Sequence, residues 1–77
     1  MSVSTQHDLL IEKLIEKLYD SNVRTRRNAA GALGMKEARA LGAIPTLSAL
    51  LSDNDPSVRA AAEITLDRLR FADHHQG

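Results

Sequence analysis

The chain has 77 residues, no cysteine, and ten basic residues balanced by ten acidic ones, so its formal net charge is zero. It can form neither a disulfide nor a cysteine-based zinc site, and no overall electrostatic field attracts nucleic acid or an anionic membrane. The longest apolar run, Leu9 to Ile11, is far too short to cross a bilayer, and the N-terminus lacks the pattern of a secretory signal. We therefore expect one cytoplasmic domain over residues 1–77.

The first predicted helix covers about residues 6–19. Leu10, Leu14 and Leu18 recur every four residues and form an apolar stripe, while charged residues occupy the opposite face. Thr5 precedes this stretch and can accept a hydrogen bond from an orphan amide of the first turn. The pattern is typical of an amphipathic helix that buries one face.

The second predicted helix covers about residues 23–33. It follows a turn at residues 20–22 made of Asp, Ser and Asn, which are residue types that both form turns and cap helices. Gly34 comes next, and glycine readily adopts the left-handed conformation that ends many helices. We therefore expect Gly34 to terminate this helix.

Two more stretches of helix are predicted before the strongest turn signal. A short helix is expected at about residues 35–41, ended by Gly42. The third main helix is expected to begin near Ile44 and Pro45 and to run to Leu51. Proline suits that position because the first turn of a helix needs no amide donor.

The strongest turn signal of the chain lies at residues 52–56. Asp55 is a good N-cap and Pro56 a good first helical residue. A fourth helix is therefore predicted from Pro56 to about Arg70, and residues 71–77 are predicted to form a polar tail. No stretch of the chain shows the period-two alternation of a strand.

The sequence matches itself at a shift of 33 residues without a gap. The matched residues lie on the apolar positions of the helices and in the turn between them. The pairs are Ile11 with Ile44, Leu14 with Leu47, Leu18 with Leu51, Asp20 with Asp53, Arg26 with Arg59, Ala29 with Ala62, and Leu33 with Leu66. Such a period is typical of solenoids, in which stacked helix pairs cover each other's apolar faces. We predict an all-α fold of two stacked helix-hairpin repeats, at about residues 6–34 and 35–70.

Two stretches resemble the HEAT and armadillo superfamily of helical repeats. Residues 53–62, DNDPSVRAAA, resemble a HEAT repeat, and residues 41–47, LGAIPTL, resemble an armadillo repeat. The resemblance implies an α-α superhelix. Armadillo repeats that hold extended peptides carry a tryptophan and an asparagine on the third helix, whereas this chain has no tryptophan and places Met35 and Arg68 at the asparagine positions. This departure argues against peptide capture of the nuclear-transport kind.

The resemblance also implies a structural role for two Asp–Arg pairs. In HEAT repeats, an aspartate in the turn and an arginine early in the second helix form a hydrogen-bonded ladder between neighbouring repeats. Asp20 with Arg26, and Asp53 with Arg59, match these roles at equal spacing. A carboxylate and a guanidinium can share two parallel hydrogen bonds, which suits such a ladder.

Candidate chemical sites are few. Asp73, His74 and His75 are potential metal ligands, but adjacent histidines on a tail rarely form a site in advance, so we predict no metal and no cofactor. His7 is expected to be an exposed residue near the N-terminus. The polar residues of the turn at 52–55 are explained by turn formation and capping, so we predict no catalytic residue, no small-molecule substrate and no enzyme activity.

The second helix of each repeat is expected to form a concave binding surface. The exposed residues expected there are Arg24, Arg27, Asn28, Gly31, Ala60, Ala61, Ile64 and Arg68. Ile64 is expected to face the open end of the stack, where either the tail from Phe71 or another chain, which could be a second copy, would cover it. The leading hypothesis is therefore a protein–protein interaction module or adaptor, with self-association through the open end as a variant.

Two alternatives stay open on the sequence. The short repeats resemble those of phycobiliprotein bilin-lyase subunits, so the chain could be an accessory or regulatory subunit of an enzyme. The cluster Arg24, Arg26 and Arg27 could contact the phosphates of a nucleic acid, although charge runs are most often solvated surface. The neutral net charge and the lack of an aromatic platform argue against the latter.

Overall fold

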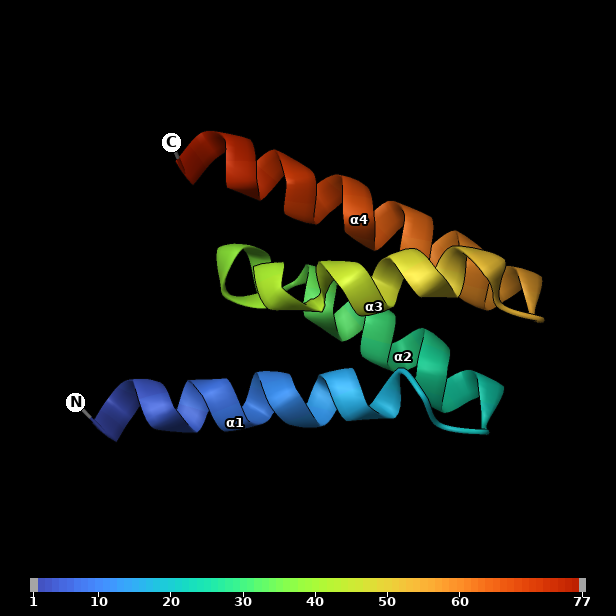
Figure 1. The fold of residues 1–77 in the computed structure, drawn as a ribbon, viewed down its shortest axis with the longest axis horizontal. Helices are drawn as coiled ribbons and strands as arrows, with labels where there is room; N and C mark the ends of the chain where they lie inside the picture. The colour runs from blue at the N-terminus through green and yellow to red at the C-terminus, as the bar shows by residue number, and fades with distance from the viewer. Residues whose placement is uncertain (1, 77) are drawn as a thin grey trace.

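The computed structural model describes the backbone of residues 2–76 and the side chains of residues 9–72. This part of the chain is helical throughout, without a strand (Figure 1). Its elements are α1 (Ser2–Lys17), α2 (Val23–Gly34), η1 (Glu37–Ala43), α3 (Ile44–Ala49), η2 (Leu50–Ser52) and α4 (Pro56–Gln76), where η denotes a 3-10 helix. The all-α prediction is confirmed.

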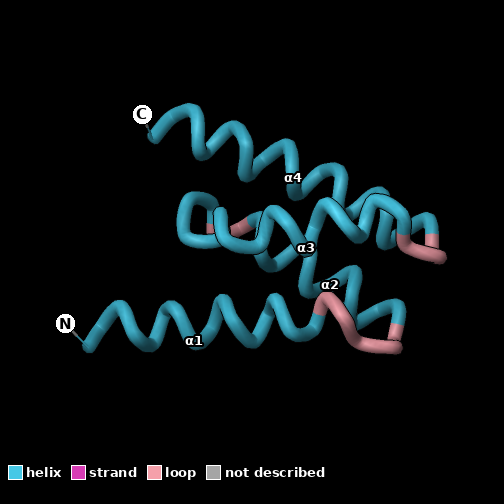
Figure 2. Tube along the Cα trace, in the orientation of Figure 1, coloured by secondary structure: helices cyan, strands magenta, loops and turns pink. Residues whose placement is uncertain are grey.

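The helices are arranged as two stacked hairpins. α1 pairs with α2, and α3 pairs with α4, while η1 connects the two hairpins (Figure 1). Because α2 packs against both α1 and α4, it lies at the centre of the stack. Loops are confined to the short turns between these elements (Figure 2). This is the architecture that the 33-residue self-match predicted.

Equivalent turns start α2 and α4. The Asp20 carboxylate accepts the Asn22 amide at 2.8 Å, and the Asn22 side chain then caps α2 by accepting the Thr25 amide at 3.1 Å. In the second repeat, Asp53 accepts the Asp55 amide at 2.9 Å, and Asp55 accepts the Ser57 amide at 2.8 Å. These bonds satisfy orphan donors of the first helical turn, so both helices begin where the sequence predicted.

Several predicted helix ends were wrong. The short helix expected at residues 35–41 is the 3-10 helix η1, which extends through Gly42 to Ala43, so Gly42 does not end it. α3 ends at Ala49, before Leu51, and gives way to η2. α1 begins at Ser2 and ends at Lys17, so it starts earlier than residue 6 and encloses Thr5, which is not its N-cap. Its C-terminal end tightens into three-residue turns, in which Leu18 bonds to the carbonyl of Ile15 at 3.0 Å. α4 continues past Arg70 to Gln76, because no glycine or proline interrupts it there, so residues 71–76 are helical and not an irregular tail.

α2 ends at Gly34 as expected, but the residue with the left-handed conformation is Glu37 and not Gly34. No glycine described by the structure has a positive φ, whereas Glu37 has a φ of 54°. α2 instead ends through 3-10 bonds, in which Met35 and Lys36 donate to the carbonyls of Ala32 and Leu33. A left-handed glutamate costs about 1 kcal/mol, so the packing of η1 must hold it in place.

The core is aliphatic and lies between the two hairpins. Its buried apolar residues are Ile11, Leu18, Ala29, Ala30, Leu33, Ala40, Ala43, Leu47, Leu50, Val58, Ala62, Leu66 and Leu69. Thr65 is the buried polar residue among those described, and its hydroxyl donates to the Ala30 carbonyl at 2.9 Å. A Cβ on Gly34 would lie 3.4 Å from Thr65, so small residues on α2 let α4 approach closely.

Candidate functional site

A ladder of hydrogen bonds joins the turns of the two repeats. Arg26 Nη2 donates to Asp53 Oδ2 at 3.0 Å, and Arg26 Nη1 donates to the backbone carbonyls of Asp20 at 2.7 Å and Ser21 at 3.1 Å. Arg26 Nε lies 2.9 Å from Asp53 Oδ1 as an ion pair, although its N–H is not aligned for a hydrogen bond. Arg26 therefore binds its own turn and the turn of the next repeat.

Arg59 repeats one half of this arrangement. Its Nη1 donates to the backbone carbonyls of Asp53 at 2.7 Å and Asn54 at 3.3 Å. The carboxylate that pairs with Arg26 thus comes from the following repeat, whereas Asp20 contributes its carbonyl oxygen. The sequence placed the four residues in a ladder without indicating this division between side chain and backbone.

The carboxylates of the second turn have lowered pKa values. The hydrogen bond from the Asp55 amide, followed by that from Arg26, lowers the pKa of Asp53 below its usual 3.8. The Ser57 hydroxyl and amide lower the pKa of Asp55. In both cases, hydrogen-bond donors stabilise the charged form of the carboxylate. The turn is therefore more stable when Asp53 and Asp55 are ionised.

The arginine cluster at the start of α2 does not form one basic patch. Arg26 is committed to the ladder, and Arg27 Nη1 donates to the Ser57 hydroxyl at 3.0 Å. Within residues 9–72, Arg24 is the member of the cluster without a hydrogen bond or ion pair, and it is exposed. Two of the three arginines therefore connect the repeats.

An apolar groove lies between α2 and α4. It contains a hollow of about 350 Å³, the first of two, which is lined by Gly31, Met35, Ala61, Ile64, Thr65 and Arg68. Met35 is 75% exposed and Ile64 is 60% exposed. Gly31 forms an open part of this surface, since a Cβ there would meet no atom within 4 Å. We call this surface the α2–α4 groove.

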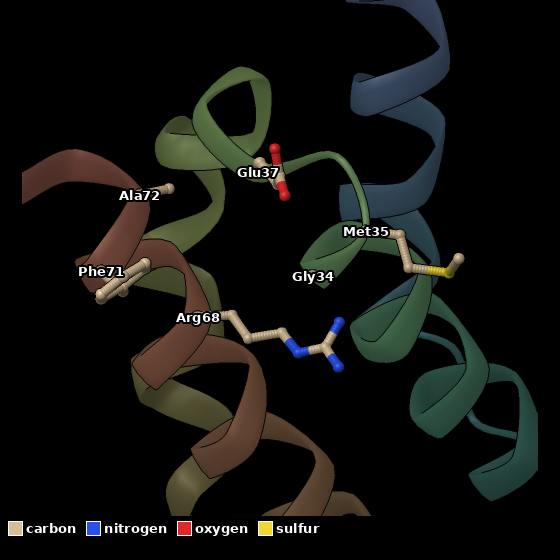
Figure 3. Close-up of a pocket in the computed structure, with 6 residues that line it drawn as sticks. All are labelled: Gly34, Met35, Glu37, Arg68, Phe71 and Ala72. Carbon is tan, nitrogen blue, oxygen red and sulfur yellow. The ribbon is translucent and has the colours of Figure 1, made fainter. Parts of the chain in front are cut away.

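A second hollow of about 360 Å³ continues the α2–α4 groove towards η1. It is lined by Gly34, Met35, Glu37, Arg68, Phe71 and Ala72, so it shares Met35 and Arg68 with the first hollow (Figure 3). Figure 3 shows the Arg68 side chain extending from α4 towards the C-terminal end of α2. No hydrogen bond or ion pair joins the Arg68 guanidinium to the side chains described for residues 9–72.

The predicted partner-binding residues divide between this groove and its surroundings. Ala61, Ile64, Arg68 and also Gly31 line the groove, whereas Arg24, Arg27, Asn28 and Ala60 do not line it. Sequence reasoning missed Met35 and Phe71 as contact residues. The 33-residue shift pairs Met35 with Arg68 and could have indicated that both face one surface.

The expectation that Ile64 faces the open end of the stack was wrong. Its counterpart at the 33-residue shift is Gly31, which stays exposed although the second repeat is already stacked on the first. A further repeat would therefore leave Ile64 exposed as well. Ile64 instead lines a groove with Gly31 of α2 and with Met35, which directly follows α2.

The remaining candidate ligands lie outside the described side chains. His7, Asp73, His74 and His75 belong to this group, so their arrangement stays a prediction. Within residues 9–72, no three His, Cys, Asp or Glu side chains are grouped as a metal site would require. None of the helices in residues 2–76 has both the length and the hydropathy needed to cross a membrane.

Stacked helical hairpins joined by an Arg–Asp ladder define a protein of the helical-repeat class. Comparison with protein-family models matches residues 11–74 to the family of HEAT repeats. The chain therefore belongs to the HEAT repeat family, as the resemblance implied. Neither the curated proteins nor the solved structures contain a significant match to it.

Proposed function

We propose that this chain is a small protein–protein interaction module, an adaptor without catalytic activity, that binds its partner through the α2–α4 groove. The observation that carries the proposal is the joint exposure of Met35 and Ile64, which line one groove from the C-terminal end of α2 and from α4. Single exposed apolar side chains are ordinary on protein surfaces, whereas grouped ones mark interaction sites. HEAT repeats as a family are typically scaffolds for protein binding, which agrees with this reading.

The base of the groove supports recognition without rearrangement. Thr65 bonds across to Ala30, and Arg27 bonds across to Ser57, so α2 and α4 are fixed relative to each other. A partner would meet a surface already in its bound geometry, which lowers the entropic cost of association. The groove is therefore a preformed binding surface, as suits an adaptor, and it does not need to fold when the partner binds.

Nucleic-acid binding receives less support from the same geometry. Arg26 and Arg27 are occupied by Asp53 and Ser57, which leaves Arg24 as the exposed member of the cluster. One free arginine neutralises too little phosphate charge for useful affinity. An accessory role beside an enzyme would use the same groove, so the identity of the partner decides between an adaptor and an enzyme subunit.

A capture experiment with matched variants tests the proposal. The full chain, its Ile64→Glu variant and its Leu51→Glu variant are immobilised and exposed to nuclease-treated native lysate. Leu51 is 42% exposed and does not line the groove, so it controls for the added charge. We expect one stoichiometric protein on the wild type and on Leu51→Glu, and its loss on Ile64→Glu. Equal retention by Ile64→Glu would contradict the proposal, and circular dichroism checks that each variant is folded.

A further inference from the structure

The charge distribution of the α2–α4 groove indicates the chemistry of its partner. Among the six residues that line the first hollow, Arg68 carries the single charge, and the others are apolar, glycine or threonine. The acidic residue Glu37 does not line this first hollow, but it lines the second hollow together with Met35 and Arg68. An apolar hollow is thus bordered by one guanidinium group.

A protein that covers this hollow must also deal with the charge of Arg68. Covering a guanidinium without giving it a partner is unfavourable, because the charge loses its hydration. Arg68 makes no hydrogen bond or ion pair with the side chains described for residues 9–72, and this includes Glu37, the acidic residue that lines the second hollow with it. The partner must therefore bring an anionic oxygen together with an apolar side chain.

The arrangement of the groove favours a helical partner. Ile64 and Arg68 lie four residues apart on α4, which corresponds to an advance of about 6 Å along the helix axis. A second helix placed along the groove presents side chains with the same spacing when they are three or four residues apart. The hollow, with a volume of about 350 Å³, has room for side chains of a partner but not for a whole helix.

We propose that the α2–α4 groove selects an acidic amphipathic helix, in which an apolar side chain enters the hollow and an Asp or Glu three or four residues away pairs with Arg68. This inference rests on the proposed protein-binding function and deepens it. A nucleic acid would satisfy Arg68 but would leave Met35 and Ile64 without an apolar partner, so a protein segment fits both halves of the groove.

A displayed library of random 16-residue peptides tests this pairing on the full chain. The selection is run on the wild type, on Ile64→Glu, on Arg68→Glu, and on Arg70→Glu, which makes the same charge change at an exposed residue outside the groove. We expect the wild type and Arg70→Glu to enrich peptides with an acidic residue three or four positions from an aliphatic or aromatic one. Arg68→Glu should bind these peptides at least about tenfold more weakly.

A charge exchange separates the two proposals. Replacing the peptide's acidic residue by Lys should weaken binding to the wild type and restore it on Arg68→Glu. Enriched peptides that are lost on Ile64→Glu but unchanged on Arg68→Glu would overturn the acidic-helix inference alone. A selection that yields no peptide dependent on Ile64 would overturn the groove as a binding surface. Enriched peptides whose sequences match a stretch of this chain would indicate that the groove binds a second copy and not another protein.

Discussion

Arg26 of the first repeat and Asp53 of the second are joined by a hydrogen bond of 3.0 Å, at side chains that are 13% and 9% exposed. The same arginine also holds the carbonyl of Asp20 in its own turn. One mostly buried side chain therefore fixes the two turns relative to each other. Because α2 and α4 leave these turns, the pair also sets the spacing of the groove between them.

Asp53→Asn should destabilise the protein by about 1.5–3 kcal/mol, because it weakens a charge-assisted bond at a mostly buried site. Asp20→Asn is the matched control, since the Asp20 carboxylate accepts the Asn22 amide and has no arginine partner among the described residues. Its cost should stay under about 1 kcal/mol. Urea unfolding of both variants measures the difference, and equal costs would show that the Arg26 pairing adds little.

Stability should decrease as the pH falls below the usual aspartate pKa. The pKa values of Asp53 and Asp55 are lowered in the folded chain, so their contribution is fully present above 3.8, the ordinary value, and is lost as the pH falls through the folded pKa. Thermal unfolding between pH 7 and pH 2 tests this. Asp53→Asn should flatten the acid limb of the curve, whereas a variant that follows the wild-type slope would assign the effect to other carboxylates.

Thr65→Val should cost about 1 kcal/mol, because it leaves the buried Ala30 carbonyl without the hydroxyl that donates to it. Thr65→Ser retains the donor and loses only a methyl group, so it controls for the change in packing. The expected signature is a lower urea midpoint for Thr65→Val with an unchanged m-value. Full stability of Thr65→Val would mean that packing against Gly34, and not the hydrogen bond, holds α4 in place.

Removing two charges from α4 should promote stacking of one molecule on another. At the 33-residue shift, Glu63 and Asp67 correspond to Ala30 and Gly34, the small residues that let α4 approach α2. Glu63 and Asp67 are exposed, and their bulk and charge prevent a helix of another molecule from packing as closely on α4 as α4 packs on α2. The double variant Glu63→Ala, Asp67→Ala should therefore self-associate in light scattering at concentrations where the wild type does not.

The control for this double variant makes the same change in net charge on α1, at the exposed residues Glu12 and Glu16. Association of both double variants would indicate a general effect of charge on solubility. A strictly unchanged mass for the α4 variant would show that other features of that face prevent stacking.

The sequence predicted those features that depend on local chemistry or on the repeat. Asn22 and Asp55 marked the starts of α2 and α4, because capping involves residues that are neighbours in the chain. The 33-residue match predicted the stacked hairpins. By contrast, the end of α4 was missed because its apolar pattern stops before the helix does, at Gln76.

The groove could not be predicted because it depends on how two helices are placed in space. Ile64 was assigned to the end of the stack from its position on α4 alone, whereas the groove also involves Gly31 of α2 and Met35 just after it. That placement follows from the contact between Thr65 and Ala30, which lie 35 residues apart. The 33-residue comparison pairs Ile64 with Gly31, but the exposure of Gly31 is known only from the structure.

Binding of a partner in the α2–α4 groove can be mapped on the protein itself by NMR. The isotope-labelled full chain is titrated with the protein identified by capture, and shifts of the Ile64 and Met35 methyl groups are compared with those of Leu9 and Leu10, which are exposed on α1. We expect saturable changes at Ile64, Met35 and the Arg68 side chain, with little change at the α1 leucines. Saturable changes confined to α1, with an unperturbed groove, would contradict the account.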